Sequence, residues 1–250
     1  MPEMKLDVLL TPGELVPGEV AGRTVVVLDV LRATTSIVEA LAAGARALYP
    51  VATIEEAIGL AKTLGRDEVL LAGERKALPI EGFDLGNSPG DFTAERIGGK
   101  MIVMSTTNGT LALMAASVAE RVLVGAWTNF QAVVDELVRA RAEPVFLCAG
   151  RDRVFGLEDA VCAGQMAAAL MKALPDAEWE MNDGAVAALA LAEEFADPAK
   201  LFPHTAAGRA ILDAGLGEDL AFCARTDLRE VVPVLEGRQI VLAAAVEAES

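Results

Sequence analysis

The segment LDVLR at residues 28–32 ends a valine-rich run with an acid and places an arginine three residues later. A carboxylate at the end of a buried strand can act as a base, a nucleophile or a metal ligand, and a nearby arginine can hold an anion. The alternative is structural: Asp29 caps a turn, and Thr34 or Thr35 caps the next helix. Capping explains the threonines better than the acid, so we predict catalytic roles for Asp29 and Arg32.

Further acids stand at the expected ends of strands or begin a helix. Glu74 lies in Gly-Glu-Arg after a predicted strand, where it is either a metal ligand or base, or half of a surface ion pair. Asp84 lies in a long glycine-containing loop that suggests a ligand-facing segment. Glu158 and Asp159 begin a long predicted helix, where the helix dipole favours acids with or without a metal. Carboxylate ligands, with Asp29 among them, would suit Mg²⁺, Mn²⁺ or Ca²⁺.

Small polar residues between a predicted strand and a predicted helix could bind an oxyanion. The run STTNGT at 105–110 leaves backbone N–H groups free at the head of a helix. The alternative is a polar cap with an Asn-Gly turn, but four consecutive donors exceed what a cap needs. Ser88, Pro89 and Asp91 also have the pattern of a helix start, with Ser88 as the N-cap. The residues predicted to bind substrate are Arg75, Asn87, Ser88, Thr106, Thr107, Asn108, Gly109, Thr110, Arg151 and Arg153.

The scarcity of histidine and cysteine, and the residues near two candidate nucleophiles, exclude several kinds of catalytic site. His204 is the single histidine, which rules out histidine clusters, and the three cysteines form no C-x-x-C pair. A cysteine phosphatase needs an arginine six residues after the nucleophile, but Val154 stands there after Cys148. A haloacid-dehalogenase phosphatase needs a second acid two residues after the first, and Leu31 occupies that place. Acid–base work must therefore come from carboxylates, water, or a lone Cys or His.

The net charge of the chain limits the classes of partner that it can bind. Lys and Arg number 21 against 37 Asp and Glu, a net charge of −16, which disfavours nucleic acids and anionic membrane surfaces. No apolar run approaches the roughly 20 residues that span a bilayer. The N-terminus lacks the pattern of a secretory signal, so we expect a cytoplasmic protein. Among assemblies, a homodimer is the commonest option.

Strands and helices alternate along the chain, which predicts an α/β fold. We expect a mainly parallel sheet with helices on both faces, in one domain over 1–250, with any subdomain boundary near 126–144. In such folds, ligands bind at the carboxyl ends of the strands, where the polar segments above lie. Strands are predicted at 23–30, 47–51, 68–72, 100–105, 121–125, 144–149 and 231–235, with 239–244 closing the chain. Helices are predicted at 34–43, 54–64, 111–119, 129–141, 157–174, 184–195 and 205–215.

Together these segments resemble the 2-phosphosulfolactate phosphatase family over about residues 9–240. The resemblance rests on the order VVLDVLRATTS, AGER, GFDLGNSPGDF, TTNGT, CAGR, LEDAVCAG and GLGEDLAFCARTDLREVVPVL. It implies a three-layer α/β/α fold and Mg²⁺-dependent hydrolysis of (R)-2-phospho-3-sulfolactate to sulfolactate and phosphate, a step of coenzyme M biosynthesis in methanogens. Two departures, Thr35-Ser36 and the segment KALP at 76–79, change no carboxylate.

The resemblance and the residues predict the same chemistry. Four arginines, at 32, 75, 151 and 153, are expected to line a positive patch for a small anionic substrate. Asp29 is the leading acid, as metal ligand or base rather than nucleophile. The rival functions are a phosphatase for another small phosphorylated acid and a non-catalytic anion-binding protein; a nucleotide binder ranks lower because no Walker loop is present. The predicted Mg²⁺ ligands are Asp29, Glu74, Asp84, and Glu158 or Asp159.

Overall fold

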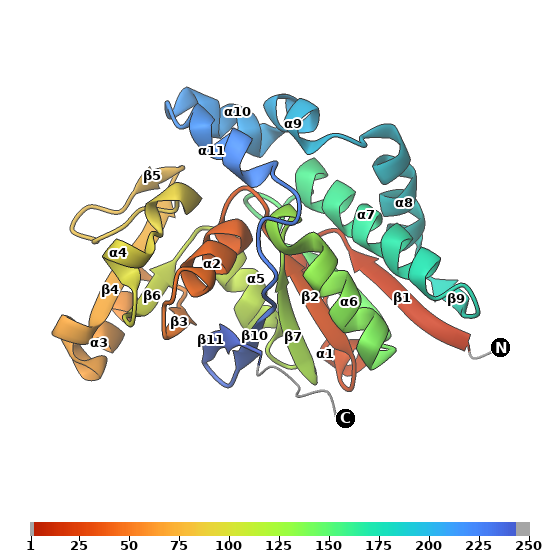
Figure 1. Cartoon of the computed structure of the whole chain (residues 1–250), viewed down its shortest axis with the longest axis horizontal. Helices are drawn as coiled ribbons and strands as arrows, with labels where there is room; N and C mark the ends of the chain where they lie inside the picture. Colours follow the sequence, from red (N-terminus) through yellow and green to blue (C-terminus); the bar gives the residue numbers. More distant parts are fainter. Residues whose placement is uncertain (1–2, 244–250) are drawn as a thin grey trace.

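The strands of the computed structural model, which describes residues 3–243, form one sheet (Figure 1). Its order is β5-β4-β6-β3-β11-β10-β7-β2-β8-β1-β9. The strands are β1 (Glu3–Leu9), β2 (Thr24–Leu28), β3 (Ala47–Pro50), β4 (Val69–Arg75), β5 (Leu78–Pro79), β6 (Met101–Ser105), β7 (Arg121–Gly125), β8 (Pro144–Cys148), β9 (Glu178–Met181), β10 (Pro233–Glu236) and β11 (Gln239–Leu242).

Strand β2 lies inside the larger parallel part of the sheet. Thr24 to Leu28 pair in parallel with β7 on one side and with β8 on the other. Val25 and Val27 pack into the core on one face, and Val26 and Leu28 pack into the core on the other. Both faces are therefore buried, which explains the continuous valine run. The antiparallel hairpin of β10 and β11 joins this part to a second parallel group of β3, β6 and β4.

Helices cover both faces and give the predicted three-layer α/β/α arrangement (Figure 1). One core packs under α6, α7 and α8, and the other under α2 and α5. No helix in the described part of the chain is long and apolar enough to cross a membrane. The helices are α1 (Pro17–Val20), α2 (Ala33–Ala42), α3 (Ile54–Leu64), α4 (Ala94–Ile97), α5 (Gly109–Ala116), α6 (Phe130–Ala140), α7 (Leu157–Ala173), α8 (Asp183–Glu194), α9 (Pro198–Leu201), α10 (Ala206–Asp213) and α11 (Gly217–Cys223).

Most predicted elements are present at nearly the predicted bounds. The helix at 54–64 matches to the residue, and the Thr53 hydroxyl caps it by accepting the Glu56 N–H at 3.0 Å. Strand β4 is longer than predicted and includes the Gly-Glu-Arg that was expected to follow it. Strands β1 and β9 and helix α11 were not predicted. The closing segment 239–244 ends outside the described residues, and a subdomain boundary near 126–144 stays a prediction.

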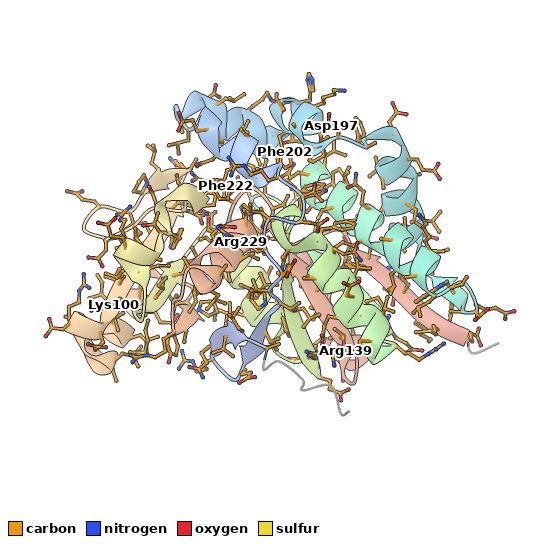
Figure 2. All side chains as sticks on the ribbon, viewed as in Figure 1. Lys100, Arg139, Asp197, Phe202, Phe222 and Arg229 are labelled. Atoms are coloured by element: carbon orange, nitrogen blue, oxygen red, sulfur yellow. The ribbon has the colours of Figure 1, made fainter. Side chains whose placement is uncertain are left out.

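The segment between α11 and β10 runs across the molecule and is tied down along its length. Figure 2 shows Arg229 where this segment passes α2. Its guanidinium pairs with the buried carboxylate of Glu39 on α2 through three hydrogen bonds of 2.7–3.2 Å. The N–H groups of Asp227 and Arg229 donate to the carbonyls of Trp127 and Thr128. The segment that follows α11 is thereby tied to α2 and to the turn after β7.

Candidate active site

A cavity of about 320 Å³ lies at the carboxyl ends of β2, β6 and β8 and beside the end of β4. Asp29 follows β2, Thr107 and Asn108 follow β6, and Gly150 follows β8. Helix α10 covers it, and the apolar side chains of Ala207, Ala210 and Ile211 line that side. In Figure 1, α10 and α11 lie at the top of the view, above α2. The site therefore combines the edge of the sheet, where ligands bind in α/β folds, with a helical cover.

Asp29 is held in this cavity by the turn into α2. Its carbonyl accepts the Thr34 N–H at 2.9 Å, its own N–H donates to the Thr34 hydroxyl at 3.1 Å, and its carboxylate accepts the Ala33 N–H at 3.3 Å. Gly109, the first residue of α5, packs so closely that a Cβ there would lie 2.7 Å from Asp29 Oδ2. A glycine is required because no side chain fits between α5 and the acid.

Burial raises the pKa of Asp29 from 3.8 to about 7. The Ala33 N–H opposes this rise, the carboxylates of Glu74 and Glu158 add to it, and the Gly109 N–H opposes it again. An acid that titrates near neutral pH inside a cavity is a candidate for proton transfer.

Two more buried carboxylates line the same cavity. Glu74 accepts the Ala77 N–H at 2.9 Å and the Thr107 N–H at 2.8 Å, so each of its oxygens is oriented by an amide. Glu158 is 3% exposed, and its Oε2 has no hydrogen-bond partner among residues 3–243. Burial raises the pKa of Glu158, while its own N–H, the Thr205 hydroxyl and Arg151 lower it. The structure thus brings Asp29, Glu74 and Glu158 together, as the sequence predicted.

Two other predicted metal ligands are engaged elsewhere. Asp159 accepts the N–H groups of Val30 and Gly150, both at 3.0 Å, and so ties the end of β2 to the end of β8. Asp84 is not in the cavity; its carboxylate accepts two 2.8 Å bonds from Arg66 and the Leu71 N–H at 2.7 Å. Neither lines the cavity, so the structure does not bring them to the carboxylates of Asp29, Glu74 and Glu158 there.

Among the cations, Arg75 and Arg151 reach the cavity and Arg153 does not. Arg75 is oriented by the Ser105 carbonyl at 3.1 Å and hydroxyl at 2.8 Å, and it has no carboxylate partner within the described chain. Arg151 donates to the Ala206 carbonyl at the start of α10. Arg153 is exposed on a turn at the surface. Lys76, which sequence reasoning missed, also lines the cavity.

The polar residues after β6 divide into two groups. The Thr106 hydroxyl accepts the Thr110 N–H at 3.1 Å, and the Thr110 hydroxyl donates to the Thr106 carbonyl at 3.0 Å, so this pair closes the turn rather than facing a ligand. Thr107 and Asn108 line the cavity, and the buried Thr107 Oγ1 has no hydrogen-bond partner among residues 3–243. Asn87 also lines it, with a buried Oδ1 that likewise lacks a partner there. The Thr107 hydroxyl and Asn87 Oδ1 are therefore available to a polar ligand, whereas Asn108 Oδ1 already accepts the Asp152 N–H at 2.9 Å.

Arg32 forms a buried part of the cavity wall. Its Nη1 donates to Asp219 at 2.5 Å and to Ser88 Oγ at 3.2 Å, and its Nη2 donates to the Ala77 carbonyl at 2.7 Å. Ser88 does not cap the short turn Pro89–Asp91; its hydroxyl donates to Asp219 instead, at 2.8 Å. Ser88 thus stands at the predicted N-cap position, with Pro89 first and Asp91 third in the turn, but its side chain makes no capping hydrogen bond. Asp219 was missed, because nothing in the sequence brings α11 to this wall.

The donor set of the cavity fits Mg²⁺. Within the described residues, no three acidic, His or Cys side chains are close enough to enclose a metal ion by themselves. Mg²⁺ is usually held by one or two carboxylates, with waters and substrate phosphate completing its octahedron. Three buried carboxylates in one cavity, with Glu158 Oε2 unpartnered, meet that need.

Comparison with known proteins gives a consistent match over almost the whole chain. A sequence model described as 2-phosphosulpholactate phosphatase matches residues 9–238. Each of three curated proteins named "Probable 2-phosphosulfolactate phosphatase" covers at least 90% of this chain. The one from Symbiobacterium thermophilum is 40% identical over 228 residues, 90% of this chain and 96% of its own. The one from Carboxydothermus hydrogenoformans is 38% identical over 241 residues, which are 95% of this chain and 97% of its own. The one from Clostridium acetobutylicum is 33% identical over 238 residues, which are 95% of this chain and 100% of its own.

Proposed function

Because the chain belongs to the 2-phosphosulfolactate phosphatase family, we propose that it hydrolyses (R)-2-phospho-3-sulfolactate to 3-sulfolactate and phosphate, with Mg²⁺ as cofactor. The observation that carries the proposal is the mixed charge of one cavity. Buried carboxylates meet there with Arg75, Lys76 and Arg151. A pure anion binder gains nothing from clustered acids, whereas metal-assisted phosphate hydrolysis needs both signs.

Each group then has a distinct task. The Thr107 hydroxyl and the Asn108 side-chain amide bind the phosphoryl oxygens, and the cations bind the substrate's carboxylate and sulfonate. The backbone N–H groups of Thr107, Gly109 and Thr110 are instead engaged with Glu74, Asp29 and Thr106. One or two of the carboxylates of Asp29, Glu74 and Glu158 would hold Mg²⁺, which would supply neutralisation of the charge on the phosphoryl group. Asp29 also holds the attacking water and takes its proton as the water oxygen bonds to phosphorus. The bond from phosphorus to the substrate oxygen breaks, and that oxygen is protonated from solvent.

The direct test is phosphate release from 2-phosphosulfolactate, with phospholactate and phosphoglycerate beside it. We expect Mg²⁺-dependent turnover, lost on addition of EDTA, and a preference for the sulfonate. Equal rates on all three would support a phosphatase for small phosphorylated acids in general. No release from any of them by the folded protein with Mg²⁺ would refute the proposed function and favour a binding protein.

A further inference from the structure

Helix α11 contributes an acid to the active-site wall from a distant part of the sequence. Asp219 lies 187 residues after Arg32, yet its Oδ2 accepts hydrogen bonds from both Arg32 Nη1 and Ser88 Oγ. The side chains of Arg32 and Asp219 are 2% and 10% exposed. Asp219 does not line the cavity, whereas Arg32 does. The acid therefore acts on the site only through the arginine.

The contacts around Arg32 fix the plane and the position of its guanidinium. Asp219 and Ser88 hold Nη1, and the Ala77 carbonyl holds Nη2 from the hairpin of β4 and β5. These bonds use three of the five N–H donors of the arginine, and the other two have no acceptor among residues 3–243. A guanidinium locked on one edge presents its remaining donors to an anion in a fixed geometry, which lowers the entropy cost of binding.

Glu218, the acid next to Asp219 on α11, shows that negative charge on this helix does not by itself explain the contact between Asp219 and Arg32. Glu218 and Asp219 both lie in the first turn of α11, where the helix dipole favours either one. Glu218 is exposed and forms no ion pair within residues 3–243, whereas Asp219 is buried against Arg32 and Ser88. The segment that follows α11 is itself tied to α2 by the Arg229–Glu39 pair.

We propose that Asp219, with Ser88, is a positioning residue that orients Arg32 toward the anionic substrate, so that α11 sets substrate affinity. This inference rests on the proposed function for its substrate. It predicts that loss of Asp219 weakens substrate binding far more than it lowers the turnover rate of the bound substrate. The reason is that Asp219 touches neither the phosphoryl group nor the attacking water.

The test compares Asp219→Ala, Asp219→Asn and Glu218→Ala in the full chain. We expect Asp219→Ala to raise KM at least tenfold with kcat changed less than threefold. Asp219→Asn should lie between Asp219→Ala and the parent, since the amide oxygen still accepts a hydrogen bond. Glu218→Ala should stay within twofold of the parent. In an Arg32→Ala background, adding Asp219→Ala should change KM by less than twofold, because the two residues act through one path.

A second readout does not depend on turnover. Calorimetry would measure binding of 3-sulfolactate and of inorganic phosphate to the parent and to the same variants, with thermal unfolding as a check on folding. At least tenfold weaker binding of either anion by Asp219→Ala, with Glu218→Ala unchanged, supports the inference even if the parent does not turn over the proposed substrate. A lower Tm for Asp219→Ala with KM and both affinities unchanged would overturn it, because Asp219 would then only dock α11. A parent chain that binds neither anion would overturn both this inference and the proposed function.

Discussion

Replacing Asp29 with asparagine should abolish catalysis and, at neutral pH, stabilise the fold. The folded state favours the protonated carboxyl, because burial raises its pKa from 3.8 to about 7. Below about pH 4 the group is neutral in the folded and unfolded states and costs nothing. Between about pH 4 and 7 the unfolded state ionises while the folded state keeps the proton, so the free energy of unfolding falls; above 7 an ionised Asp29 remains buried near Glu74 and Glu158 and the loss is complete. Asparagine has nearly the same shape, keeps an acceptor for the Ala33 N–H, and carries no charge.

The size of the effect follows from the pKa. A rise of about three pH units, at about 1.4 kcal/mol each, corresponds to about 4 kcal/mol of unfolding free energy. The advantage of Asp29→Asn should be near zero at pH 4, grow between pH 4 and 7, and stay constant above pH 7. A stability gained where function is lost is the trade-off expected of a strained active site.

The assay is urea unfolding of parent and variant from pH 4 to 8.5, with EDTA to remove divalent cations. Low protein concentration is needed near the isoelectric point of about 4.5, where the chain carries little net charge. Glu218→Gln, an exposed change, should differ from the parent by no more than about 0.5 kcal/mol throughout. A constant difference between Asp29→Asn and the parent across the whole range would refute the reasoning, because the charge of Asp29 would then not be the cause.

The remaining predictions concern activity and packing. If ionised Asp29 takes the proton from water, kcat/KM should rise with pH to a plateau, and the midpoint should lie below 7 with saturating Mg²⁺ and move toward 7 as Mg²⁺ is lowered, because the bound cation favours the ionised carboxylate. A midpoint that does not move with Mg²⁺ would remove Asp29 as the base. Gly109→Ala should lower activity at least tenfold and stability by about 1–3 kcal/mol, because the new Cβ would lie 2.6 Å from Ala33 Cβ; crystal structures and unfolding curves would check this. Asp84→Ala should cost about 1–2 kcal/mol through the lost Leu71 and Arg66 bonds, yet leave kcat/KM within twofold; a larger loss would return Asp84 to the active site.

Local patterns were enough to predict much of the fold. The apolar run of β2 indicated a strand buried on both faces, and Thr53 marked the start of α3 because capping depends on residues three apart. Strands β1 and β9 were missed, although their residues alternate between more exposed and more buried positions as those of a half-buried strand do. Their pairing partners lie far along the chain, so their places in the sheet could not be read from their own residues.

The site was predictable where chain position implies spatial position. Asp29 and Glu158 follow parallel strands or begin the helix after one, so the fold must bring them to one edge of the sheet. Asp84 is also an acid in a polar loop, like Asp29, yet it lies outside the cavity. Its carboxylate pairs with Arg66, and that contact cannot be read from spacing.

The sequence by itself determined the α/β class, the family and the edge of the sheet where the chemistry lies, because these follow from local periodicity and from motif order. The tertiary structure alone decided which acids share the cavity, that Gly109 must lack a side chain beside Asp29, and that Asp219 reaches Arg32. The physical reason is that burial, close packing and long-range hydrogen bonds depend on distances between segments far apart in the chain. Residue type and spacing do not fix those distances.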